Sequence, residues 1–467
     1  MQTLTELQLT TEEKEILKKL ADAGYTPAYV YFERILKQRL NLPNDLLKDK
    51  EKFHYFFALL ANNNPHLLSR IISKGTAEGG KFKGFICSSY EELSLIMSLI
   101  NLKGGMYIDY HDPVMDKKIL YRIKVQRGFF KDFEISLIIS VNSKYQFNLV
   151  REVLKEEIKD NIVKIFLRIG LSEEDMKEIK DSIKDKDGFS YTYFNYHGNY
   201  ARFGVEDLKG VMEEVKKENI KVGFHIYPGT NIKSVEYYEN FVKKVKKIYE
   251  EYKDYVFAVD FGGGFGVNYE ECRPEDEVLK KAVEVIYNEF PKDTEKIIEP
   301  GRTIIAPSGV LLTSVKDAKE KNGILFLTVN AGFPNFARPY IYEEFHKVEL
   351  LGENKEEKDV LIGGFSMASQ DFLYGEFMKN PNCKGISPVK PKKLEVPQYQ
   401  SVEELIDTPV VIHCTGAYGY NMASRFSGRP KPMEILVVEG RAYIIRDSEK
   451  DDGLFAGVPD IPREINL

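Results

Sequence analysis

The stretch Asp260-Phe261-Gly262-Gly263-Gly264-Phe265-Gly266 decides the fold, and it closes the apolar run Val256–Phe261. A short apolar run predicts a buried strand, and the consecutive glycines after it predict a tight turn into a helix. Glycine has no Cβ, so the backbone N–H groups of such a turn can approach an anion. The stretch therefore predicts a strand–turn–helix unit that either packs tightly or holds a phosphate.

Seven further β-prone runs surround this one, with charge-laced stretches that permit helices between them. Eight strands alternating with helices over about 250 residues are typical of an α/β fold, the (β/α)8 TIM barrel. Before the sixth run the chain makes a long excursion over residues 170–220, which suggests a function. The eight runs are Phe53–Leu59, Phe82–Cys87, Met106–Tyr110, Phe133–Ser140, Ile162–Ile169, Ile220–Ile226, Val256–Phe261 and Lys296–Glu299.

The two ends of the chain do not continue this alternation of strands and helices. Near the start, Thr10 and Glu13 form a capping box for an amphipathic helix, and the β-prone run Ala28–Phe32 follows it. After Pro307 the strand-like runs have Gly- and Pro-rich connections, which predict a β-rich, barrel- or sandwich-like domain. We therefore expect an N-terminal helix and strand (1–45) that join the β domain, the barrel (46–310) and the C-terminal β domain (311–467).

Composition narrows the class of protein. The 467 residues include 66 Lys+Arg and 72 Asp+Glu, so the formal charge is −6, and 43% are hydrophobic. Such a chain can build a core, and its mild acidity gives no electrostatic footprint for nucleic acid or an anionic membrane. Four cysteines without a CxxC pair argue against a disulfide scaffold or a zinc site, and Cys414 is expected to be a buried, inert thiol. We expect a soluble, cytoplasmic protein with no metal, no nucleic-acid partner and no membrane partner.

Polar side chains fall at the carboxyl ends of the predicted strands, where barrels of this class carry their chemistry. The alternation of side chains turns Lys164 and Arg168 inward on the fifth run, and it turns His225 and Asp260 inward on the sixth and seventh. Glu299-Pro300-Gly301-Arg302 ends the eighth run. Its carboxylate and guanidinium could bind a ring nitrogen and a substrate carboxylate, or they could form a structural ion pair.

Taken together, these segments resemble the fold-type III decarboxylases that depend on pyridoxal phosphate (PLP), the diaminopimelate/ornithine/arginine decarboxylase group. The resemblance implies a barrel of the alanine-racemase type plus a β domain, and it runs from about Phe53 to Pro430. Two of its motifs, Arg338–Tyr342 and Gly416–Ser424, look closest to the diaminopimelate branch. The motifs are Phe57–Pro65, Leu167–Ile169, Ala201–Gly204, Phe224–Ile226, Gly262–Gly264, Glu299–Arg302, Arg338–Tyr342 and Gly416–Ser424.

The resemblance implies a role for each matching residue. Glu299 would pair with the pyridine nitrogen, His225 would stack on the ring, and Tyr418 would reach the phosphate through its hydroxyl. The family is dimeric, and the Ser366–Asp371 segment of one subunit would complete the site of the other. The implied cofactor-binding residues are Arg168, His225, Gly262, Gly263, Gly264, Glu299, Gly301, Arg302 and Tyr418, and the implied substrate-binding residues are Arg302, Arg338, Tyr342 and Asp371.

The sequence departs from the family at the positions that carry chemistry. Leu60 stands where the family has the lysine that forms a Schiff base with PLP, and Met367 and Ala368 stand where it has a general-acid Cys and a Glu. Tyr227-Pro228 replaces a small Gly-Ser that contacts the phosphate. An aliphatic side chain at position 60 supplies neither a nucleophile nor a proton carrier. Lys164 is no substitute, because it lies four residues below Arg168, roughly 13 Å down the strand.

Two hypotheses follow from this pattern. One is a decarboxylase-like enzyme that acts on an amino acid by an altered mechanism. The other is a non-catalytic homologue, a homodimer that binds PLP without a covalent link, a phosphate-like anion or an amino-acid-like ligand. The missing lysine favours the second hypothesis.

Overall fold

The computed structural model describes residues 7–77, 79–99, 102–183, 196–378, 387–450 and 453. It divides into two compact units, which are treated separately below. The barrel unit comprises residues 36–268 and 273–306, and the β unit comprises residues 1–35, 269–272 and 307–467. Part of the long excursion, residues 184–195, lies outside the described residues. Within the described part of the chain, no helix is long and apolar enough to cross a membrane.

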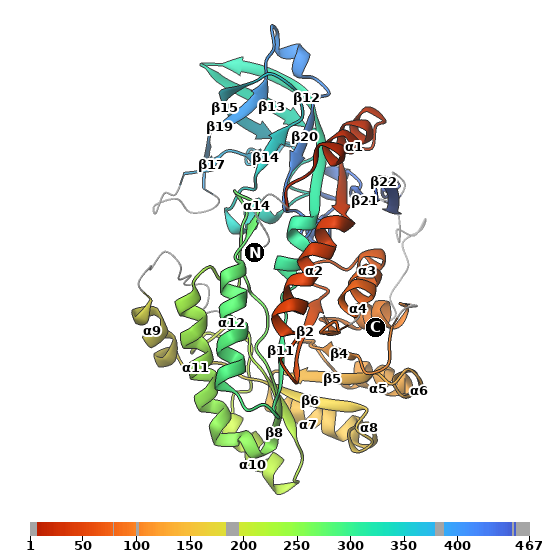
Figure 1. Cartoon of the computed structure of the whole chain (residues 1–467), viewed down its shortest axis with the longest axis vertical. Helices are drawn as coiled ribbons and strands as arrows, with labels where there is room; N and C mark the ends of the chain where they lie inside the picture. The colour runs from red at the N-terminus through yellow and green to blue at the C-terminus, as the bar shows by residue number, and fades with distance from the viewer. Residues whose placement is uncertain are drawn as a thin grey trace, which may run out of the picture. The chain divides into compact units, whose positions relative to one another are not determined.

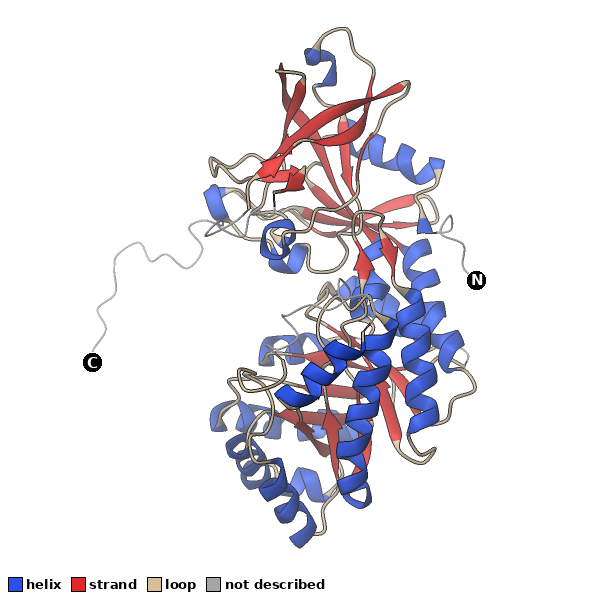
Figure 2. Cartoon of the chain, turned by 90° about the vertical axis from the view of Figure 1, so that its left-hand side faces the viewer, coloured by secondary structure: helices blue, strands red, loops and turns tan. Residues whose placement is uncertain are grey.

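The barrel unit is a closed ring of eight parallel strands surrounded by helices (Figures 1 and 2). All eight predicted strands are present, so the predicted TIM barrel is confirmed. In ring order the strands are β11 (Glu295–Ile298), β2 (Phe53–Ala58), β3 (Phe82–Cys87), β4 (Tyr107–Tyr110), β5 (Ser136–Val141), β6 (Val163–Arg168), β7 (Val222–His225) and β8 (Val256–Asp260). The helices are α2 (Glu33–Leu47), α3 (Pro65–Gly75), α4 (Tyr90–Met97), α5 (Lys117–Val125), α6 (Arg127–Asp132), α7 (Lys144–Val153), α8 (Lys155–Lys159), α9 (Glu173–Ser182), α10 (Leu208–Lys217), α11 (Val235–Tyr252), α12 (Asp276–Glu289) and α13 (Gly301–Ile305).

The barrel interior follows the predicted alternation of side chains. Phe166 of β6 packs in a buried apolar cluster with Phe56, Ile138 and Ala258 of other strands. Lys164, two residues earlier on the same strand, donates to the Tyr107 hydroxyl at 3.3 Å and lies over the Phe257 ring. Lys164 is therefore held low in the barrel, as its spacing from the strand end predicts.

The end of β2 is shaped by a turn and a helix cap. The Ala61 N–H donates to the Ala58 carbonyl, and the Asn64 side chain accepts from the backbone of His66 at the start of α3. Asparagine before a helix and proline as its first residue are favoured at these positions. The turn leaves Leu60 60% exposed, while Leu59 and Ala61 on either side of it are buried.

The β unit is built on a ten-stranded sheet, and this confirms the predicted β-rich C-terminal domain. Strand β1 (Ala28–Phe32) runs antiparallel to β12 and parallel to β21, so the N-terminal strand completes the sheet. Helix α1 (Thr11–Asp22) begins with the predicted Thr10–Glu13 capping box. The other strands of the sheet are β12 (Gly309–Lys321), β13 (Ile324–Val329), β14 (Val348–Leu350), β15 (Lys355–Gly363), β16 (Phe372–Tyr374), β19 (Lys392–Pro397), β20 (Pro409–Ile412), β21 (Met433–Val438) and β22 (Arg441–Arg446).

Among the described residues, four short strands lie outside the barrel and the ten-stranded sheet, and they form two pairs. Strand β9 (Val267–Asn268) pairs with β10 (Arg273–Pro274), and β17 (Glu376–Phe377) pairs with β18 (Val389–Lys390). Helix α14 (Arg338–Tyr342) carries two of the residues that the sequence predicts to bind substrate.

The cysteines correct one expectation. Cys414 is not a free thiol, because it forms a disulfide with Cys272, and their Cα atoms are 5.5 Å apart. The two residues are 142 positions apart, so no spacing motif could predict that they pair. Only the folded chain brings them together. Cys272 lies in the segment 269–272, which belongs to the β unit although its neighbours in sequence belong to the barrel unit.

Candidate functional site

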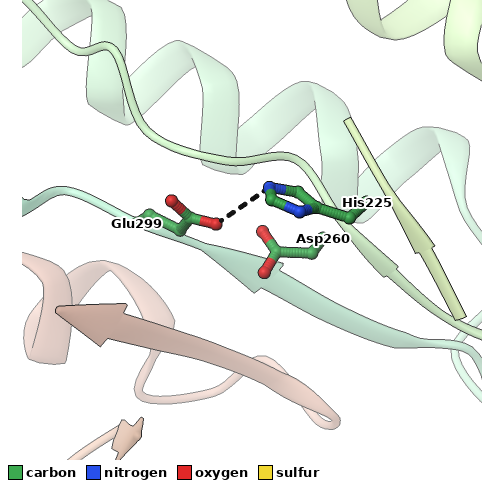
Figure 3. Close-up of side chains that lie close together, drawn as sticks. All are labelled: His225, Asp260 and Glu299. Carbon is green, nitrogen blue, oxygen red and sulfur yellow. Dashed lines mark ion pairs between the residues drawn. The ribbon is translucent and has the colours of Figure 1, made fainter. Parts of the chain in front are cut away.

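Three polar side chains meet at the ends of three adjacent barrel strands (Figure 3). His225 is the last residue of β7, Asp260 is the last residue of β8, and Glu299 directly follows β11. One ligand atom from each lies within 4.8 Å of the others, and all three residues are buried. Such a set of one imidazole and two carboxylates could hold a protonated ring nitrogen or a divalent cation.

His225 is held as a neutral imidazole. Its Nε2 atom lies 3.2 Å from Glu299 Oε1 and accepts a hydrogen bond from the Arg168 guanidinium at 3.0 Å. The direction follows because arginine has only donors. Burial and the charge of Arg168 hold the pKa of His225 well below its usual range. The ring of His111 packs edge-on against that of His225, with their centroids 4.9 Å apart.

Both carboxyl groups of the cluster have raised pKa values. Burial, opposed by the charge of Arg168, raises the pKa of Glu299 to about 7. Burial and then the charge of Glu299 raise the pKa of Asp260 well above its usual range. Glu299 Oε1 and Asp260 Oδ2 are buried without a hydrogen-bond partner, and so is His225 Nδ1. The cluster thus has unused hydrogen-bonding capacity, which a polar ligand group could satisfy.

The raised pKa of Glu299 predicts a pH effect on stability. Between pH 4.5 and pH 7 the folded chain binds more protons at this group than the unfolded chain, so its contribution to stability falls as pH rises. We expect Glu299→Gln to gain stability relative to the native chain over this window, by up to about 3 kcal/mol. Urea unfolding from pH 4.5 to pH 8, with hydrogen exchange to identify the barrel strands, measures the difference.

Glu349 in the β unit supplies a control of opposite sign. Burial alone would raise the pKa of Glu349, but hydrogen bonds from His413 and Lys14 hold it well below its usual range. Glu349→Gln should therefore lose stability relative to the native chain as pH rises through the range in which the unfolded carboxyl ionises. If the Glu299→Gln difference shows no pH dependence, the raised pKa of Glu299 is excluded.

The glycine run Gly262–Gly264 begins two residues after Asp260 and packs against the backbone of Glu299. The Gly262 N–H donates to Asp260 Oδ1 at 2.8 Å, and Gly262 has a φ of 64°, in the left-handed region that favours glycine. A Cβ on Gly263 would lie 2.3 Å from the Glu299 carbonyl oxygen, and one on Gly264 would lie 2.0 Å from that of Gly229. Close packing of the backbone therefore requires glycine at these two positions.

The start of α13 lies beside the turn that carries Leu60. A Cβ on Gly301 would be 3.5 Å from Ala61 Cβ and 3.6 Å from the Ala58 nitrogen. Arg302 is buried, and its guanidinium donates to the Thr230 hydroxyl at 2.7 Å. The structure therefore brings the turn that carries Leu60 next to the Glu299–Arg302 motif, through Ala58 and Ala61.

The remaining predicted site residues belong to the β unit, where their local partners are defined. Arg338 is buried, with its guanidinium 2.7 Å from Glu344 and stacked 3.4 Å from the centre of the Tyr269 ring. The Asp371 carboxylate accepts from the backbone N–H groups of Phe333 and Ser366.

Two further positions of the β unit are exposed, and a third has a left-handed backbone conformation. The Met367 side chain is 99% exposed, Tyr342 is 44% exposed, and Tyr418 has a φ of 57°. One of the Asp371 contacts described above is made with Ser366, the residue before Met367. Met367 itself is exposed to solvent. The structure thus brings together Arg168, His225, Glu299 and the glycines of the barrel, and it describes Arg338, Tyr342, Asp371 and Tyr418 within their own unit.

Sequence reasoning missed two contributors to the barrel cluster. His111 directly follows β4, and its Nε2 lies 3.0 Å from the side-chain oxygen of Asn142, which directly follows β5. Burial and the neighbouring His225 and Arg168 hold the pKa of His111 well below its usual range. The signal was available, since both are polar residues at the carboxyl ends of barrel strands.

Comparison with known proteins identifies the family. The family described as pyridoxal-dependent decarboxylase, pyridoxal binding domain, matches residues 33–306, which is more than half of the chain, so the chain belongs to this family. It is 27% identical over 456 residues to diaminopimelate decarboxylase of Aquifex aeolicus, covering 93% of this chain and 92% of the relative. It is 26% identical over 446 residues to that of Campylobacter jejuni, covering 92% and 96%.

A solved structure shows the same fold. Diaminopimelate decarboxylase from Helicobacter pylori complexed with L-lysine matches with a TM-score of 0.71 at 21% identity, over 94% of this chain and 98% of that one. The predicted membership of the PLP decarboxylases is therefore confirmed. The cofactor of the family fits part of the cluster, since the orphaned Glu299 oxygen can accept from a protonated ring nitrogen.

Proposed function

We propose that this chain binds PLP without a covalent link and does not run the ordinary decarboxylation of its family. The single observation that carries the proposal is Leu60, which lies in the turn after β2 and offers no amine. Without an amine there is no nucleophile for the aldehyde and no lysine to move protons. The relatives named diaminopimelate decarboxylase supply the substrate class to test, an amino acid with a distal polar end.

The residues that would hold PLP are those of the barrel cluster. Glu299 would accept from the ring nitrogen, and the backbone of Gly262–Gly264 and of Gly301 would face the phosphate. When bound, PLP supplies an electron-withdrawing ring. The chain's own contribution is orientation and charge: Arg168 donates to His225, and burial raises the pKa values of Asp260 and Glu299.

A second candidate function, decarboxylation by an altered mechanism, is favoured by one observation. Glu299, Arg302, Arg338 and Tyr342 are all retained, and they would serve as an ion clamp for an amino acid. Against it, Arg338 is already ion-paired with Glu344 at 2.7 Å, so a substrate carboxylate would have to compete for it. The altered positions 60, 367 and 368 also remove the amine, the acid and the selector together.

Turnover of a substrate panel separates the two candidates. Purified chain is incubated with PLP and diamino acids, including diaminopimelate, lysine and ornithine, and release of CO2 and amine is followed. We expect no turnover above the rate of PLP alone in the native chain. We expect some in Leu60→Lys combined with Met367→Cys, because a positioned acid or base typically contributes 10²–10⁴-fold. Turnover by the native chain would establish the altered enzyme instead.

A further inference from the structure

Position 60 is the point at which the site could distinguish one form of the ligand from another. Pyridoxal, pyridoxamine and pyridoxine 5′-phosphates share the ring nitrogen and the phosphate, and they differ only in the aldehyde, amine or alcohol at C4′. A lysine would select the aldehyde by bonding to it, because only an aldehyde condenses with an amine. Leu60 makes no such selection, since it has no polar or nucleophilic atom in its side chain.

Leu60 places an aliphatic side chain on a partly exposed turn. Leu60 is 60% exposed between two buried neighbours, so its side chain projects from the turn rather than packing beneath it. The turn that carries it lies against Gly301, one residue from Arg302 and two from Glu299. The turn that carries position 60 therefore lies beside the Glu299–Arg302 motif.

The groups that remain recognise what the three ligands have in common. Glu299 Oε1 and Asp260 Oδ2 are buried and orphaned, and a protonated ring nitrogen satisfies such a pair. The glycines of the turn Gly262–Gly264 have no Cβ, which lets an anion such as a phosphate approach their backbone. Neither feature depends on the substituent at C4′.

We infer that the ligand class of this site is the pyridine-ring 5′-phosphates as a group, whatever the oxidation state of their C4′ carbon. The inference rests on the proposed non-covalent binding of PLP and adds its selectivity. A site that is blind to C4′ would bind whichever of these phosphates is abundant. That behaviour suits a carrier or a sensor of the group, whereas a catalyst needs the aldehyde alone.

Isothermal titration of the native chain with each ligand tests the inference without any measure of activity. We expect PLP and pyridoxine 5′-phosphate, which are both uncharged at C4′, to have dissociation constants within about threefold of each other. Pyridoxamine 5′-phosphate carries a cation at C4′ and should fall within about tenfold of them. Inorganic phosphate and unphosphorylated pyridoxal serve as partial ligands and should bind far more weakly.

The outcomes separate the inference from the function on which it rests. If PLP binds and pyridoxine 5′-phosphate binds more than tenfold more weakly, the inference is overturned while binding of PLP stands. If none of the three binds, the proposed function itself fails. Leu60→Lys should acquire a preference for PLP over pyridoxine 5′-phosphate, and Leu60→Met, which stays apolar, should keep the ratio of the native chain.

Discussion

Leu60→Lys is expected to turn a reversible PLP site into a covalent one. The new ε-amine would project from the turn after β2, beside Gly301 and the Glu299–Arg302 motif. An amine placed next to a bound aldehyde condenses with it, and the bond adds to the contacts already present. We expect the affinity for PLP to rise at least about tenfold, which is about 1.4 kcal/mol. Borohydride should then fix the ligand on the peptide that contains residue 60.

Leu60→Met is the matched control, because it changes an aliphatic side chain at the same exposed position without adding an amine. It should bind PLP as the native chain does and give no adduct on that peptide. If Leu60→Lys binds PLP yet takes no adduct, position 60 does not meet the aldehyde, and the alignment of Phe57–Pro65 with the family motif is wrong.

Arg168→Met is expected to cause the largest loss of stability in the barrel unit. Arg168 is buried, donates to His225 and provides the positive charge that faces Asp260 and Glu299. Removing one partner from a buried group of charges typically costs 3–5 kcal/mol, because the remaining charge is left uncompensated. We expect a loss of about 3 kcal/mol at pH 8, measured by urea unfolding and assigned by hydrogen exchange in β6–β8.

The loss should be smaller at low pH. Without Arg168 the pKa values of the two carboxyl groups rise further in the folded chain, so stability falls more steeply as pH rises. At pH 5 the pair can take a second proton and the uncompensated charge disappears. Arg168→Met combined with Glu299→Gln should recover much of the loss at pH 8, since the double variant removes both partners. Equal losses at pH 5 and pH 8, without recovery in the double variant, would show that Arg168 acts through packing alone.

Much of the barrel could be predicted from the sequence, because its strands are short apolar runs and their inward side chains follow a period of two. The same alternation placed Arg168, His225 and Asp260 at neighbouring strand ends, where the structure has them. The resemblance to a family added the roles of residues such as Tyr418, whose local sequence reads only as a turn.

The rest depended on contacts between distant parts of the chain. The Cys272–Cys414 disulfide joins residues 142 positions apart, and no local pattern encodes that approach. The contact of His111 with His225 and the raised pKa values of Asp260 and Glu299 arise only when the barrel closes. Leu60 is the reverse case: a single residue in the sequence carries the functional conclusion, and the structure adds that it is 60% exposed in the turn after β2.

Peptide mapping after borohydride reduction tests the central claim most directly. The native chain is mixed with one equivalent of PLP, reduced and digested, and an unreduced sample is denatured and filtered in parallel. The account predicts that PLP is released intact on denaturation and that no lysine peptide carries a stoichiometric adduct. A stoichiometric adduct on one lysine would contradict it, because the chain would then hold its cofactor as an ordinary member of the family does.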